Sequence, residues 1–301
     1  MVFRAFFLLL AALPILAGCR RPASPTELSP TPVPSVAASA SPARVLLPDH
    51  LPLEDGVRAD WGSPVEIVSY QTGDEARAQI DQSDLALVSQ EIIAEKIASG
   101  VLSPIEDSLL PALHRPQNLF LHHYFDAQNR FSVPYAWSLL GVAYRHQALG
   151  APVKNWKAIF SSGKPVAFLP ENAQLLRLAA KIGLQPVPQT VAPDLADIQI
   201  GPVAALRRLP PEWTVALPAE GSYITLYSWV IPAGAKHSDH ARAALVALFK
   251  PENLARFGTE THWGLTQKTA RSLLPAEQAQ DPLLYPPDPG RYLDLCNFLR
   301  P

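Results

Sequence analysis

Two histidine-rich stretches are the first places in this sequence where residue types and spacing could support chemistry. His122 and His123 are adjacent, and His237-Ser238-Asp239-His240 holds two further imidazoles beside a carboxylate. Such groups bind transition metals, but a stable site needs ligands that converge from separated positions. Neighbouring histidines on a strand would face opposite ways, and the second stretch lies where a helix should begin, with Ser238 or Asp239 as its cap. We therefore expect no metal ion and no cofactor.

The motifs of the common enzyme classes are also missing. The sequence has no G-x-S-x-G elbow, H-E-x-x-H pair, P-loop or G-x-G-x-x-G fingerprint, so the usual motif routes to catalysis lack their residues. The formal net charge of −2 gives no basic stripe for nucleic acid and no polybasic patch for a membrane surface. The sequence thus favours a protein that is not an enzyme and does not bind nucleic acid.

The N-terminus reads as an export signal. Residues 5–16, AFFLLLAALPIL, follow Arg4 and form a 12-residue apolar block, too short to cross a bilayer comfortably and typical of a secretory h-region. Leu16-Ala17-Gly18-Cys19 resembles a bacterial lipobox. This resemblance implies that residues 1–18 are a cleaved signal peptide and that Cys19 carries the lipid. A general signal peptide with an incidental cysteine is the alternative.

A tether should follow the anchor. Residues 19–43 are dominated by Pro, Ser, Thr and Ala, a composition that cannot bury enough apolar surface to fold. Extended at roughly 3 Å per residue, such a segment would span on the order of 70 Å. With Cys19 lipidated, Cys296 is left alone, which excludes a disulfide framework and a thiolate metal cluster.

From about residue 44 the chain alternates short β-branched runs with helical patterns, which favours an α/β fold. We expect strands at 44–47, 64–71, 84–89, 141–145, 165–169, 196–200, 213–217 and 222–232, and helices at about 72–81, 89–100, 173–183 and 238–249. Thr72-Gly73-Asp74-Glu75 is a capping box, Ser89 is an N-cap candidate, and Gly100 should close its helix. The strand at 222–232 is long enough to pass between two lobes.

Three segments resemble the spermidine/putrescine-binding group of periplasmic proteins that serve ABC transporters. FSVPYAWSLLGVAYR (131–145) is similar to the stretch that crosses between lobes in that family. Residues 217–257 resemble its Pro-x-Glu-Gly segment with the following strand, turn and helix. SLLPAEQAQDPLLYPPD (272–288) resembles its Leu-Leu-Pro-x-Glu and Leu-Tyr-Pro pattern. Their order and spacing together carry the resemblance, which runs with gaps from about residue 44 to the end.

The resemblance implies a two-lobed type II periplasmic solute-binding fold with a hinged cleft. By analogy, lobe 1 comprises residues 44–138 and 228–270, and lobe 2 comprises 139–227 and 271–301. In such proteins a ligand that touches both lobes stabilises a closed form, which docks on the permease. No covalent chemistry is needed.

The expected pocket departs from the family. A polyamine pocket needs carboxylates at amine spacing and aromatic faces for the methylenes. After the first strand, Asp49 and His50 replace a loop bearing Trp and Tyr, while Tyr227 and Thr225 replace an aspartate and an aromatic residue. Glu171 is the one carboxylate left where the family has an acidic pair. Lobe 2 is also shorter than in the family. The resemblance therefore supports the fold more strongly than it supports a polyamine ligand.

We expect roughly half of twelve candidates to contact a solute, because few polar groups fix orientation in such sites. Ser89 could equally be only a helix cap, Tyr135 and Trp137 could wedge the lobe interface, and Asp49 with His50 could be an exposed loop tip. The candidates are Asp49, His50, Ser89, Gln90, Glu91, Tyr135, Trp137, Ser138, Glu171, Asn172, Ser222 and Tyr227.

Two functions remain open at this stage. The first is a lipid-anchored, monomeric receptor on the periplasmic or cell-surface face of a bacterial membrane, which binds a small polyamine-like solute and delivers it to ABC permease subunits. The second is a non-transport lipoprotein that uses the same fold as a sensor or structural module. The trimmed lobe 2 and the thinned carboxylates motivate the second.

Overall fold

The computed structural model describes residues 42–51, 53, 55, 58, 64–106, 109, 116–150, 152–169, 191–219 and 221–288. They belong to one compact unit that begins at Ser41. The predicted signal peptide, Cys19, the tether, the helix at 173–183, Glu171, Asn172 and Cys296 lie outside the described residues. Within the described ranges, every helix is too short or too polar to span a bilayer.

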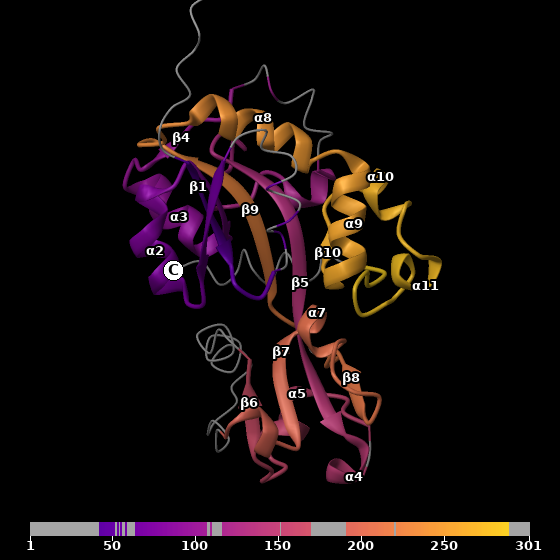
Figure 1. The fold of residues 1–301 in the computed structure, drawn as a ribbon. Helices are drawn as coiled ribbons and strands as arrows, with labels where there is room; N and C mark the ends of the chain where they lie inside the picture. Colours follow the sequence, from indigo (N-terminus) through magenta and orange to yellow (C-terminus); the bar gives the residue numbers. More distant parts are fainter. Residues whose placement is uncertain are drawn as a thin grey trace, which may run out of the picture. The chain divides into compact units, whose positions relative to one another are not determined.

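The first part of the sheet has parallel strands followed by antiparallel ones. β1 pairs in parallel with β2 and β3, and β9 then runs antiparallel between β3 and β5. The order along the sheet is β2-β1-β3-β9-β5 (Figure 1). The bounds are β1 Ala43–Pro48, β2 Val65–Tyr70, β3 Leu85–Ser89, β5 Ser132–Arg145 and β9 Ile224–Pro232.

β5 joins this first part to a second part of the sheet. Its residues 132–139 pair with β9, whereas residues 140–145 pair with β7 and β8. The second part is completed by β6, parallel to β7; the bounds are β6 Val166–Phe168, β7 Ile198–Pro202 and β8 Trp213–Ala216. All of β9 pairs within the first part. The chain therefore passes between the two parts through β5 and before Ile224, not along β9 as expected.

The helices follow local signals in the sequence. At α2 (Gly73–Gln79), the Thr72 hydroxyl accepts from the Glu75 amide at 3.2 Å, and the Glu75 carboxylate accepts from the Gln71 amide at 2.7 Å. This reciprocal capping confirms the predicted helix start. α3 (Gln90–Ala98) is followed by Gly100 with φ of +70°, as expected of a glycine that closes a helix. Ser89 is the N-cap residue of α3, as predicted, although its side chain makes no capping hydrogen bond.

The remaining elements cover the two parts of the sheet. In chain order they are η1 Ile80–Gln82, β4 Leu102–Ser103, η2 Asn118–Phe120, α4 His146–Leu149, α5 Trp156–Phe160, η3 Pro193–Leu195, α7 Val203–Leu206, α8 Ser238–Leu248, α9 Pro251–Thr261, β10 Gly264–Leu265, α10 Lys268–Arg271 and α11 Ala276–Ala279. β4 pairs with β9, and β10 pairs with β5.

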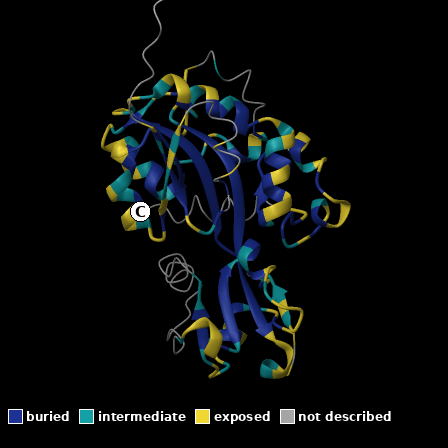
Figure 2. Ribbon diagram, viewed as in Figure 1, coloured by how far each residue is buried: buried dark blue, intermediate teal, exposed yellow. Residues whose placement is uncertain are grey.

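The core is centred on β5 and β9, which are buried along almost their whole length (Figure 2). Tyr135 packs against Trp229 with ring centroids 5.8 Å apart, and Trp137 packs against Phe120 at 5.6 Å. A Cβ at Gly264 would lie 2.6 Å from the Trp137 ring, so only glycine lets β10 approach β5 so closely. Burying these rings removes large apolar surfaces from water and holds the two parts of the sheet around β5.

Two buried aspartates organise loops around this core. The Asp126 carboxylate accepts from the backbone amides of Arg130, Phe131 and Ser132, each at 2.9 Å, and from the Ser132 hydroxyl at 2.9 Å. It thereby fixes the turn that leads into β5. Asp84 accepts from the amides of Arg44 and His237, each at 2.8 Å, which ties the start of α8 to β1. Such bonds satisfy polar groups that burial would otherwise leave without water.

Residues 276–285 pack against the first part of the sheet, and Asp281 among them also pairs with Arg207 after α7. The Tyr285 hydroxyl accepts from the Leu265 amide at 3.0 Å, and its ring lies 6.0 Å from that of Trp137. The Gln278 amide donates to the Gly258 carbonyl in α9. These contacts and the pairing of β9 favour the first part of the sheet for residues 224–232 and 276–285, and the lobe boundaries stay predictions.

Candidate functional site

Three rings from distant parts of the sequence meet beside the carboxyl ends of β1 and β3. His50 follows β1, Tyr227 lies in β9 opposite Ser89 of β3, and Trp263 follows α9. The ring centroids are 5.9 Å apart for His50 and Tyr227, 6.0 Å for His50 and Trp263, and 5.1 Å for Tyr227 and Trp263. The edge where parallel strands end is a common place for ligands. We call these three residues the aromatic group.

Burial controls the charge of His50. Desolvation lowers its pKa below the ordinary value of 6.5, and the nearby Asp49 carboxylate opposes this less strongly. Asp49 lies 3.7 Å from Nδ1, which favours a proton on that nitrogen. Nε2 is buried and has no hydrogen-bond partner among the residues that the structure describes. A neutral His50 therefore presents an unused acceptor at Nε2.

The aromatic group lines two adjoining cavities. The smaller, of about 150 Å³, is lined by all three rings together with Tyr70, Thr225 and others. The larger, of about 500 Å³, shares His50 and Trp263 with it. Leu169 and Ala205 line both cavities as well. Because these two residues follow β6 and lie in α7, the cavities are enclosed by segments from both parts of the sheet.

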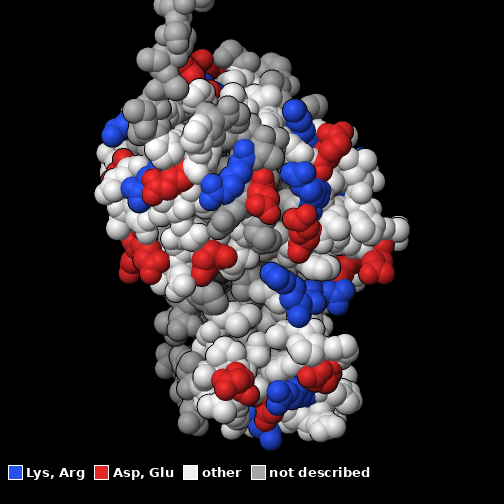
Figure 3. Space-filling view, in the orientation of Figure 1, with Lys and Arg blue, Asp and Glu red and all other residues white. Residues whose placement is uncertain are grey.

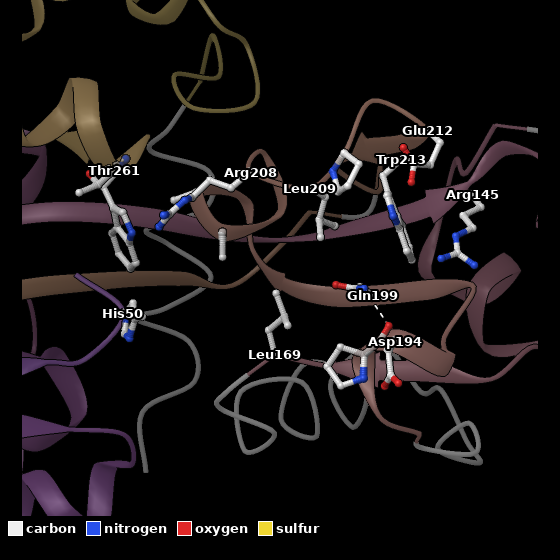
Figure 4. Close-up of a pocket in the computed structure, with 15 residues that line it drawn as sticks. His50, Arg145, Leu169, Asp194, Gln199, Arg208, Leu209, Glu212, Trp213 and Thr261 are labelled. Atoms are coloured by element: carbon white, nitrogen blue, oxygen red, sulfur yellow. Dashed lines mark hydrogen bonds between the residues drawn. The ribbon is translucent and has the colours of Figure 1, made fainter. Parts of the chain in front are cut away.

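Charged side chains line the larger cavity (Figure 4). Asp194, Glu212 and Arg145 lie at one end, whereas Arg208 lies nearer to His50 and Thr261. The Arg145 guanidinium lies 5.0 Å from the Trp213 ring centroid and 3.9 Å from the Asp197 carboxylate. Acidic and basic residues are similarly interspersed on the face in Figure 3. The larger cavity therefore carries charged groups of both signs.

The structure brings Asp49, His50 and Tyr227 together, and for these three a contact with solute stays our prediction. Trp263, Tyr70 and Arg208 were not among the candidates although they line the same cavities. A tryptophan in the short turn between a helix and a strand was the one signal for Trp263. His262 before it has φ of +58°, a left-handed conformation that turns the chain there.

Several other candidates are held within the framework of the protein, and a contact with solute stays untested for them. Tyr135 and Trp137 are 1% and 2% exposed and are packed in the core. The Gln90 amide donates to the Ile224 carbonyl at 2.8 Å and accepts from the Leu226 amide at 2.8 Å, which holds α3 on β9. Three more are hydrogen-bonded within the protein: Ser138 to the Ala204 amide, Ser222 to the Leu140 carbonyl and Glu91 to the Tyr223 hydroxyl. Ser89 is buried at the end of β3.

The histidine-rich stretches are held by local contacts. His122 Nδ1 lies 3.1 Å from the Ala127 carbonyl, and His123 Nε2 lies 2.9 Å from the Leu119 carbonyl; both residues are in a loop rather than on a strand. His237 is the N-cap residue of α8, and its side chain makes no capping hydrogen bond. The Asp84 carboxylate accepts from the His237 amide. Over the described ranges, no group of three or more His, Cys, Asp or Glu residues could hold a metal ion.

Comparisons with known proteins fit this fold. The chain is 24% identical over 267 residues to the putrescine-binding periplasmic protein PotF of Escherichia coli, covering 68% of this chain and 70% of that protein. A solved structure of the spermidine/putrescine ABC transporter substrate-binding protein PotD from Streptococcus pneumoniae aligns with a TM-score of 0.71 at 19% identity over 86% of this chain and 98% of that one. The PotD lipoprotein of Treponema pallidum aligns with a TM-score of 0.68 at 16% identity over 78% and 88% of the two chains.

The chain has the type II fold of the periplasmic solute-binding proteins. Its resemblance to the polyamine-binding group is confirmed by the sequence match to PotF. No protein-family model matches it. PotF is named as a putrescine-binding protein and PotD as a transporter substrate-binding protein, and the prediction that this chain is not an enzyme agrees with those names. In this solute-binding fold, the aromatic group lies where segments of both parts of the sheet enclose a cavity.

The lowered pKa of His50 predicts a pH-dependent stability. When the chain unfolds, the imidazole regains its ordinary pKa of 6.5, so below that pH the unfolded state binds a proton that the folded state takes up less readily. The free energy of unfolding should therefore fall as pH drops from 6.5 toward the lowered pKa. Above pH 6.5 the imidazole is neutral in both states, so His50 should add no pH dependence there.

Urea unfolding of the native protein and of His50→Gln at pH 8.0, 6.5 and 5.5 checks this. His262, whose pKa is also lowered by burial and by Arg207 and Arg208, is present in both proteins and cancels in the comparison. If the free energies of unfolding of the two proteins changed equally with pH, His50 would not be the source of the pH dependence.

Proposed function

We propose that the protein is the solute receptor of an ABC importer and that it binds an amine-bearing solute at the aromatic group. The buried, unpartnered Nε2 of His50 within a cage of aromatic rings is the observation that carries this proposal. An ammonium group can donate to this nitrogen while its charge interacts with the ring faces. The Asp49 carboxylate next to His50 adds an attraction for a positive charge.

The relatives support an amine ligand. PotF is named for putrescine and the aligned PotD for spermidine and putrescine, and both compounds present ammonium groups on flexible methylene chains. In this chain Tyr70, Tyr227 and Trp263 offer apolar surface for methylenes beside His50. The small cavity admits only one end of such a chain, so the rest would extend into the larger cavity.

Closure would couple binding to transport. A solute that contacts His50 from the first part of the sheet and Leu169 or Ala205 from the second would stabilise a closed arrangement. We propose that this arrangement delivers the solute to the permease subunits, and that Cys19 and the tether hold a monomeric receptor on the outer face of a bacterial membrane. The sequence of residues 16–19 supports the anchor.

Calorimetric titration of the purified full chain in a mild detergent with putrescine and spermidine tests the proposal. Micromolar binding, about −8 kcal/mol, is the expected result for at least one of them. Repeating the titration at low and at physiological salt shows how much of the affinity is electrostatic. No heat from either amine at millimolar concentration would contradict a polyamine receptor.

A further inference from the structure

The charges of the larger cavity do not suit a purely cationic solute. Arg145 and Arg208 line it together with Asp194 and Glu212, so guanidinium and carboxylate groups are equal in number. A polyamine carries two or more positive charges and no negative one. Its entry would leave the guanidinium groups facing like charge, which is unfavourable in a partly enclosed site.

Arg208 is the guanidinium best placed to meet a solute. It follows α7 and is exposed, and its guanidinium has no ion-pair or hydrogen-bond partner among the residues that the structure describes. Its charge, after burial and together with Arg207, lowers the pKa of His262, so the guanidinium lies near the segment that carries Trp263. In Figure 4 its side chain is directed toward the end of the cavity where His50 and Thr261 lie.

The neighbouring arginines are already engaged. Arg207 pairs with the buried carboxylate of Asp281. Arg145 stacks on Trp213 and lies near Asp197 at the other end of the cavity. Among the described residues that line the larger cavity, Arg208 is therefore the arginine that remains available beside the aromatic group.

We propose that the solute carries a carboxylate, which Arg208 binds, in addition to the amine held at the aromatic group. The planar guanidinium can donate two parallel hydrogen bonds to a carboxylate, an arrangement that an amine cannot match. The substrate class is then a short amino acid whose amine and carboxylate are separated by methylenes. This inference rests on the proposed amine site and refines its ligand.

Two probes of matched length separate a diamine from an amino acid. Calorimetric titration of the full chain in detergent compares putrescine with 4-aminobutanoate, in which one ammonium end is replaced by a carboxylate, and with 5-aminopentanoate. We expect one of the amino acids to bind at least tenfold more tightly than putrescine. In Arg208→Gln this preference should disappear, with the amino-acid affinity falling about 10- to 100-fold.

Arg256→Gln is the matched control, because Arg256 is an exposed arginine on α9 that lines neither cavity. It should bind like the native protein, and thermal unfolding should show all three proteins equally folded. Tighter binding of putrescine than of both amino acids, or amino-acid binding that is unchanged in Arg208→Gln, would overturn the inference and leave the amine receptor standing. No binding of any probe would overturn both.

Discussion

Replacing Asp126 with alanine is expected to lower the free energy of unfolding by about 3 kcal/mol, because the change leaves three backbone amides and one hydroxyl without their acceptor. Asp126 is 6% exposed, so water cannot replace the lost bonds without entering the loop. For a chain of this size the melting temperature should fall by roughly 10 °C. The measurement is urea and thermal unfolding of the variant against the native protein.

Two variants make the Asp126 result interpretable. Asp126→Asn keeps one acceptor oxygen and should lose only part of the stability. Asp239→Ala removes a carboxylate that is 96% exposed and pairs with Arg242 at the start of α8, and should change stability very little. If Asp126→Ala unfolded with the same midpoint as Asp239→Ala, the loop before β5 would not depend on this carboxylate.

Replacing His50 with alanine is expected to weaken binding of the amine solute roughly 10- to 100-fold. The variant loses an acceptor for a charged donor, an interaction that contributes about 1.5–3 kcal/mol when enclosed. It also removes one ring of the aromatic group. The measurement is the dissociation constant by calorimetry at pH 7.5, where the lowered pKa keeps His50 neutral.

A histidine outside the site serves as the control for His50→Ala. His146 is exposed in α4 and lines neither cavity, so His146→Ala should bind like the native protein. The His50 side chain retains 31% of its exposed surface, so its loss should alter folding less than truncation of buried Trp263 would. Equal affinities for His50→Ala and His146→Ala would place the solute away from the aromatic group.

The strands and the first two helices were predictable because their signals are local. Alternating apolar runs located β1, β2 and β3, and the pairing of Thr72 with Glu75 marked the start of α2. The crossing strand β5 followed from the resemblance of residues 131–145 to a known stretch. Such signals depend on neighbours within a few residues, and a single sequence contains them.

The roles of polar residues at strand ends depend on partners far along the chain, so the sequence alone does not show which candidates are held by other parts of the protein. Gln90 lies at the start of α3, where a side chain could contact a ligand. Its amide instead makes hydrogen bonds with the backbone of β9, more than 130 residues away in the sequence. Trp263 joins the aromatic group only because His262 adopts a left-handed conformation and α9 ends beside β5. Neither the hydrogen bonds of Gln90 nor the position of Trp263 produces a periodic pattern in the sequence.

A crystal structure of the protein with bound solute would show whether the aromatic group holds the amine. The account predicts an amine nitrogen within about 3 Å of His50 Nε2, beside the rings of Tyr227 and Trp263, whose centroids lie 5.1 Å apart. Its other end should extend into the larger cavity toward Arg208. An amine bound instead at Asp194 and Glu212, with the aromatic group untouched, would contradict the account.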